Sequence, residues 1–138
     1  MNTMFGLLVG TILFAAVVLQ AQQKFSTAGA RIAYAQKNMI VGLHSDNPGV
    51  VESTMMIVAK MKMIYLFVKI PVILSVIDSI ATAHTSASLR YKAFLVANIC
   101  ADPAWFAQKH ILETSETDLF YNSAAKHLQH KMLGMYSL

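Results

Sequence analysis

The chain has 138 residues, of which 56% are hydrophobic and only 13% are charged, and its mean hydropathy is +0.50. An ordinary water-soluble domain is about half apolar and about a quarter charged, so the shortage of charge is the informative feature. The net charge of +4 comes from scattered lysines and arginines, without the basic runs typical of nucleic-acid binding. The composition therefore favours one small membrane-associated unit and argues against nucleic acid as a partner.

The first apolar run is Met4–Ala21, which contains no charged residue. At about 18 residues it is near the lower limit for a bilayer-spanning helix. A secretory signal peptide ending at Ala21 is the alternative, but no lysine or arginine precedes the run. We therefore expect an uncleaved transmembrane anchor. Gly6 and Gly10 form a GxxxG pair inside it, which is a candidate site for helix packing.

A helical apolar stripe follows and ends at the clearest turn signal in the chain. Hydrophobic residues recur at spacings of three and four from Phe25 to Met39. In the next segment, GLHSDNPG, Gly42 suits a helix C-cap, Asn47 an N-cap and Pro48 the first helical position. The sequence therefore predicts a helical hairpin with its turn at about residues 42–48.

The returning arm is predicted to start at Pro48 and to cross the bilayer over residues 63–83. This stretch contains Lys69, Pro71 and Asp78. We expect Pro71 to kink the helix, and Lys69 and Asp78 to lie on opposite faces because they are nine residues apart. A charge at mid-bilayer costs about 2.5–3.5 kcal/mol on insertion scales, so these residues are candidates for packing or charge pairing between subunits. A proton or ion pathway is the alternative.

Residues 84–138 are predicted to form an extramembrane tail of short amphipathic helices. The segment around Arg90 and Lys92 has an apolar core too short to cross a bilayer, which suggests a helix lying at its surface. Asp102 and Pro103 predict the start of another short helix. The predicted fold class is therefore all-α, with a transmembrane helical hairpin over residues 1–83 and a helical tail. The bias of lysine and arginine toward the hairpin favours both termini outside.

Catalytic and metal-binding motifs are absent from the sequence. There is no P-loop, dinucleotide-binding glycine turn, GxSxG elbow or HExxH. His127 and His130 form an HxxH pair, and His110 and Glu113 have the same spacing, but this spacing alone is a weak signal for zinc. The single cysteine, Cys100, is typical of a small buried residue. We therefore predict no catalytic residue, no cofactor and no metal ion.

One local resemblance points to an enzyme. The segment RIAYAQKN, Arg31 to Asn38, resembles the R-x-x-x-A-Q-x-N segment of the membrane-associated glutathione and eicosanoid enzymes, the microsomal glutathione transferase family. The resemblance implies that Arg31 and Asn38 help to hold glutathione. It covers eight residues, and that family is a four-helix bundle, whereas two spans are predicted for this chain.

The favoured function is structural: a small accessory subunit of a multi-subunit membrane assembly, such as a respiratory or ATP-synthase-type complex. The expected partners are other membrane subunits and the lipid bilayer of an organellar or bacterial inner membrane. Two alternatives stay open. One is an internal-membrane or scaffold protein of a lipid-containing virus, and the other is a small transporter, channel or glutathione-transferase-like membrane enzyme.

Overall fold

The computed structural model describes residues 27–136, whose regular structure is entirely helical. Packing divides the chain into two units, Met1–Ala35 and Gln36–Leu138. In the first unit the described residues form the start of α2 (Ala28–Leu43), where the Thr27 hydroxyl accepts a hydrogen bond from the Ala30 N–H at 3.1 Å. The predicted anchor over residues 4–21 lies outside the described residues.

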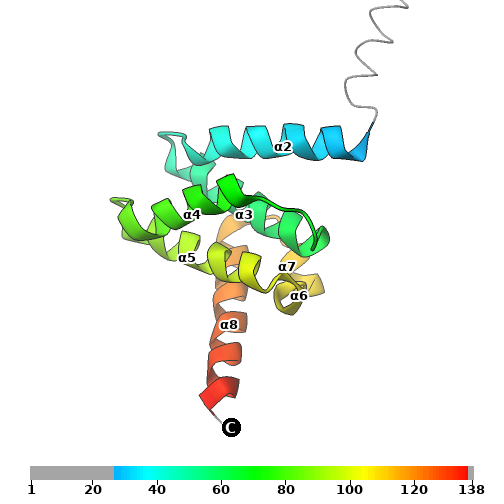
Figure 1. Ribbon diagram of the computed structural model, residues 1–138. Helices are drawn as coiled ribbons and strands as arrows, with labels where there is room; N and C mark the ends of the chain where they lie inside the picture. The colour runs from blue at the N-terminus through cyan, green and yellow to red at the C-terminus, as the bar shows by residue number, and fades with distance from the viewer. Residues whose placement is uncertain (1–26, 137–138) are drawn as a thin grey trace, which may run out of the picture. The chain divides into compact units, whose positions relative to one another are not determined.

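In the second unit six helices follow the end of α2. They are α3 (Pro48–Ile64), α4 (Pro71–Ala83), α5 (Ala87–Ala101), α6 (Pro103–Phe106), α7 (Lys109–Leu112) and α8 (Thr117–Tyr136). Figure 1 shows α5 lying beside α4 and α3, with α8 running away from them. The largest fully buried side chains come from several of these helices: Met55, Ile73, Leu95, Phe106, Ile111 and Phe120. One hydrophobic core therefore joins residues far apart in the sequence.

Helix α5 is the centre of this unit, although the sequence predicts it to lie on a bilayer surface. It packs against α4, α3, α6 and α8, and its N-terminus is capped by Ser86, whose hydroxyl accepts from the Leu89 N–H at 3.3 Å. Its buried residues include Leu95, Val96 and Ile99. Successive buried positions spread over a wide arc of the helix, which suits a helix surrounded by others better than one with a single apolar side. Contacts between α4 and α5 also cross the predicted boundary at residue 83.

The predicted turn between α2 and α3 is confirmed. The Asn47 side chain accepts a hydrogen bond from the Gly49 N–H at 2.9 Å, and Pro48 is the first residue of α3. Gly42 was expected as a C-cap, and this is wrong: it lies inside α2, and no described glycine has a positive φ. The space around Gly42 explains the residue instead. A Cβ there would stand 2.3 Å from the Thr54 hydroxyl oxygen, so α2 and α3 can approach only because the side chain is missing.

Replacing Gly42 with alanine is therefore expected to destabilise the protein by about 1–3 kcal/mol, the usual cost of overpacking. The Thr54 side chain cannot move away cheaply because its hydroxyl donates to the Val50 carbonyl at 2.7 Å. Chemical denaturation followed by circular dichroism measures the effect. Gly29→Ala is the matched control, since a Cβ there would meet nothing within 4 Å. Equal stability of the two variants would contradict the close approach.

The single helix predicted over residues 63–83 is wrong, because α3 ends at Ile64 and α4 starts only at Pro71. Pro71 does not kink a helix but begins one, a position where its missing N–H leaves no hydrogen bond unmade. One face of α4 is buried in the helical unit through Ile73, Ile77 and Ile80. None of the helices described within residues 27–136 has both the length and the apolar character required to traverse a bilayer.

Candidate interaction site

The connection between α3 and α4 is an ordered segment held by several hydrogen bonds. The Lys62 ammonium donates to the Leu66 carbonyl at 3.0 Å and to the Val68 carbonyl at 2.9 Å. The Val68 N–H donates to the Tyr65 carbonyl at 3.1 Å. At the end of the segment, the side-chain amide of Gln36 donates to the Lys69 carbonyl at 3.3 Å. Three backbone carbonyls of the connecting segment are thus satisfied by side chains.

Four consecutive apolar residues of this region are exposed: Ile64, Tyr65, Leu66 and Phe67. We call them the apolar tip. Phe67 is 95% exposed and Ile64 is 60% exposed, whereas Ile70, three residues beyond Phe67, is buried. A phenylalanine in open solvent gains nothing for folding, because its apolar surface stays in water. Grouped apolar side chains on a surface are typical of an interaction site.

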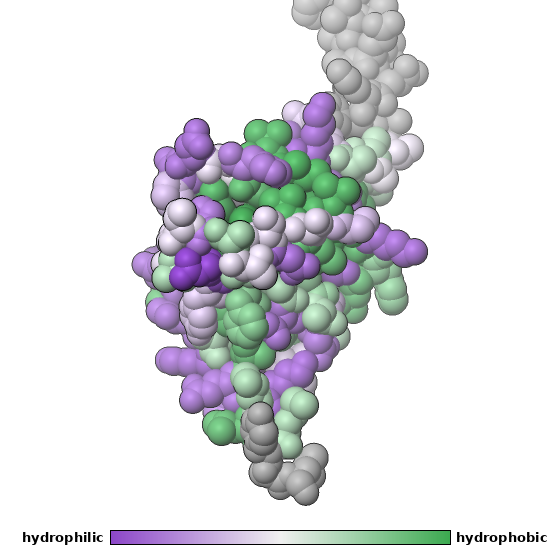
Figure 2. All heavy atoms as spheres, turned by 60° about the vertical axis from the view of Figure 1, so that its left-hand side comes forward, coloured by the Kyte–Doolittle hydropathy of each residue, from purple (hydrophilic) through white to green (hydrophobic). Residues whose placement is uncertain are grey.

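Two hollows adjoin the apolar tip. One, of about 410 Å³, is lined by residues 64–68 themselves. The other, of about 400 Å³, is lined by tip residues and by Lys62, Lys69, Pro71, Leu74 and Cys100. The tip therefore has a shaped, largely apolar surface with lysines beside it. Figure 2 brings forward the left-hand side of Figure 1, away from the tip, and shows hydrophobic side chains gathered in one area there with hydrophilic ones around them.

The predicted charged residues lie close to the tip along the chain but not within one helix. Lys69 is in the connecting segment and Asp78 is in α4, and both side chains are exposed. Among residues 27–136 neither has an ion-pair partner in the structure. The structure thus leaves both charges at the surface of the helical unit. Gly6 and Gly10, the predicted packing pair, lie outside the described residues.

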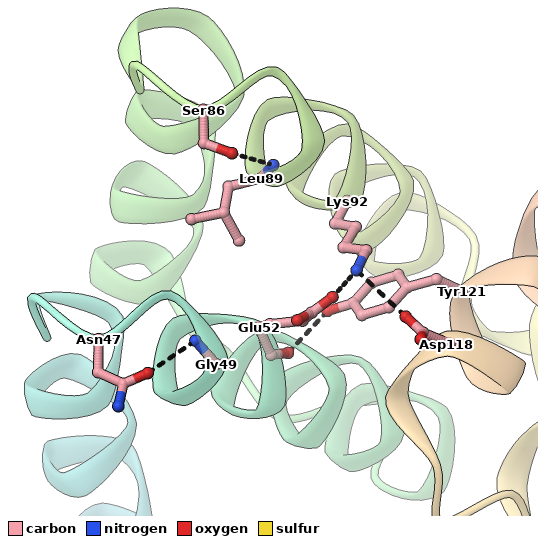
Figure 3. A network of polar contacts seen from close by, with 8 residues as sticks. All are labelled: Asn47, Gly49, Glu52, Ser86, Leu89, Lys92, Asp118 and Tyr121. Carbon is pink, nitrogen blue, oxygen red and sulfur yellow. Dashed lines mark hydrogen bonds and ion pairs between the residues drawn. The ribbon is translucent and has the colours of Figure 1, made fainter.

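A second polar cluster, which the sequence analysis missed, joins α3, α5 and α8 (Figure 3). Lys92 pairs with Glu52, and their side chains are only 17% and 19% exposed. The Lys92 ammonium also lies 3.6 Å from the Asp118 carboxylate and 5.1 Å from the centre of the Tyr121 ring. The Tyr121 hydroxyl donates to the Glu52 carbonyl at 2.8 Å, and burial raises its pKa well above the ordinary value. These contacts connect three helices, so the cluster has a structural role.

A third cluster fixes the start of α6 to α8. The Lys131 ammonium is 2.5 Å from the Asp102 carboxylate, and this hydrogen bond holds the pKa of Asp102 below its usual range. His127 donates to the Trp105 carbonyl at 2.8 Å, with the two rings 5.3 Å apart. The prediction of a helix beginning at Pro103 is confirmed.

A shallow groove of about 710 Å³ runs between α5 and α8. It is lined mainly by apolar and amide side chains: Tyr91, Phe94, Asn122, Leu128, Gln129 and Met132. No pair of titratable side chains arranged for acid–base chemistry faces it, and Lys126 is its only charged lining residue among those described. The groove is thus lined mostly by uncharged side chains.

The residues considered for catalytic and metal chemistry can be placed in the described part of the chain. Within residues 27–136 no three histidine, cysteine or acidic side chains lie close enough together to hold a metal ion. Cys100 is buried as expected, and burial raises its pKa to about 12, so the reactive thiolate is scarce at neutral pH. Arg31 and Asn38, which resemble glutathione-binding residues, are exposed on α2. That helix ends at Leu43 without running on into another apolar helix.

Comparison with known protein families, characterised proteins and solved structures gives no match. The function has to be inferred from the chain's own residues. Phe67, in the apolar tip, is the most exposed of the large hydrophobic side chains in the described part of the chain. Sequence analysis missed it because it assigned residues 64–67 to the interior of a spanning helix. The preference of proline for the first turn of a helix, at Pro71, was the signal that could have separated α3 from α4.

Proposed function

We propose that this chain is a membrane-anchored, non-catalytic accessory subunit of a larger membrane assembly. In this proposal the uncharged segment Met4–Ala21 is the anchor, and the helical unit from residue 36 onward makes contacts outside the bilayer core. The observation that carries the proposal is the apolar tip, an ordered group of exposed apolar side chains in which Phe67 is almost wholly in solvent.

Three other features agree with a structural role. The buried polar side chains of the Glu52–Lys92 cluster are used in holding helices together. The exposed charges of Lys69 and Asp78 are available to groups of opposite sign on neighbouring subunits. Surface charges of this kind contribute more to orientation and partner choice than to affinity. The alternative of a proton pathway required Lys69 to lie inside a spanning helix, whereas Lys69 lies in the segment between α3 and α4.

Purification of the full chain from its native membrane in mild detergent tests the proposal. We expect it to migrate with partner proteins as a defined complex much larger than its 15.2 kDa. Asp78→Asn is expected to weaken recovery of the complex, while Asp46→Asn, an exposed change in the α2–α3 turn, serves as the control. A stable, monodisperse monomer in mild detergent would overturn the proposal.

A further inference from the structure

The apolar tip is preformed rather than adaptable. Lys62 bridges two carbonyls of the segment, and the buried side chain of Ile70 fixes its far end in the core. Pro71 then restricts the backbone where α4 begins. A segment already held in one conformation loses little conformational entropy when it enters another phase or contacts a partner. Figure 1 shows the connection as a projecting turn at one end of the α3–α4 pair.

The chain segment around the tip carries charged side chains of one sign. Residues 53–77 contain Lys60, Lys62 and Lys69 and no aspartate or glutamate. The Lys60 ammonium donates to the Thr114 carbonyl, and the Lys62 ammonium donates to the Leu66 and Val68 carbonyls. Lys69 is exposed, two residues from Phe67. Of the flanking carboxylates, Glu52 pairs with Lys92, while Asp78 lies close enough to Cys100 to act on it electrostatically. Lys62 and Lys69, which line the same hollow as Cys100, outnumber this carboxylate. An anionic surface would therefore meet attraction at the tip.

The residue types match the interface of a bilayer. Tyrosine and phenylalanine beside lysine are the side chains that sit at the boundary between headgroups and acyl chains. Surface basic residues near an anionic leaflet are attracted by its negative potential. The uncharged segment Met4–Ala21, acting as an anchor, would keep the helical unit close to the bilayer and give the tip a high effective concentration there.

We propose that the apolar tip inserts into the headgroup region of an anionic bilayer, with Phe67 entering the acyl boundary and Lys69 contacting anionic headgroups. The inference rests on the proposed membrane role and names the lipid as the partner of this surface. Burial of one phenylalanine side chain shifts such an equilibrium by about tenfold or more. One lysine at an anionic surface contributes about fivefold.

The test uses the full chain in nanodiscs, carrying Phe67→Cys labelled with an environment-sensitive fluorophore. Cys100 is buried, so labelling is directed to the introduced residue, and the unsubstituted chain gives the blank. Nanodiscs of zwitterionic lipid are compared with nanodiscs containing phosphatidylglycerol. We expect the blue shift and the protection from acrylamide to be clearly larger with the anionic lipid. Glu116→Cys, at another exposed position, is the control and should stay accessible in both.

Lys69→Gln in the labelled chain is expected to reduce the ratio of inserted to exposed tip by about fivefold, and added salt should have a similar effect. Equal acrylamide access in both lipids would overturn the proposal. The proposal would also be overturned if protection from acrylamide increased with the number of protein copies in a nanodisc, because a second copy of the chain would then be covering the tip. The two proposals can fail independently. A stable monomer in mild detergent would refute the role as a subunit. A label that stays accessible to acrylamide while the complex is intact would refute only the insertion of the tip.

Discussion

Replacing Lys92 with methionine is expected to lower the free energy of unfolding by about 3 kcal/mol. Glu52 and Lys92 are mostly buried, and the Glu52 Oε1 atom accepts no other hydrogen bond within the described residues. Removing the lysine leaves a carboxylate without a partner in the core, and it also removes the cation over the Tyr121 ring. The expected loss is at the lower end for buried pairs, because about a fifth of each side chain still touches water. Chemical denaturation of the full chain in mild detergent measures it.

An exposed pair in the same protein provides the control. Lys109 and Glu113 are 3.9 Å apart, and their side chains are 85% and 67% exposed. Lys109→Met should therefore change stability by less than about 0.5 kcal/mol. A double variant, Glu52→Leu with Lys92→Met, should regain most of the loss, since no uncompensated charge is left. A single Lys92 variant as stable as the Lys109 variant would show that the pair is not needed.

Replacing Phe120 with alanine is expected to destabilise the protein by about 3–5 kcal/mol. Phe120 is fully buried at the start of α8, with its ring 5.2 Å from the Tyr121 ring and 5.8 Å from the Lys60 ammonium. The change leaves a cavity where α8 meets α3, and neighbouring helices can close it only in part. The same denaturation experiment measures the loss.

Phe67→Ala is the matched control, because it removes the same atoms from a side chain that is 95% exposed. Its effect on stability should stay within about 0.5 kcal/mol. A similar loss at both positions would mean that the tip is packed in the protein and is not a free surface. The comparison therefore distinguishes a phenylalanine that stabilises the core, Phe120, from one on a free surface, Phe67.

Local signals in the sequence predicted a good part of the fold. The all-helical class, the turn before Pro48 and the helix beginning at Pro103 depend on periodicity and capping, which are read from a few neighbouring residues. The break between α3 and α4 was missed because residues 63–83 are mostly apolar, and apolarity alone does not distinguish a spanning helix from a buried one. The burial of Ile73 and Ile77 in the protein core, which depends on long-range packing, is what identifies α4 as a helix of the core.

The polar clusters were less accessible to sequence analysis. Glu52, Lys92 and Tyr121 are separated by tens of residues, and only the packing of three helices brings them together. The candidate charges Lys69 and Asp78 were noticed because charge is rare in this chain, but their setting depended on a helix that is interrupted. Composition thus singled out these two residues, but only the structure showed what surrounds them.

The cluster around Trp105 gives the protein its own optical reporter. Trp105 is the only tryptophan of the chain, and its ring lies against His127 and 5.7 Å from the Lys131 ammonium. An indole beside an imidazole and a cation emits differently from one in water, so its fluorescence depends on α6 and α8 staying together. Detachment of α8 would change the emission even while the other helices stay folded, and circular dichroism would record mainly those helices. The two signals together therefore resolve the loss of one helix from the unfolding of the whole unit.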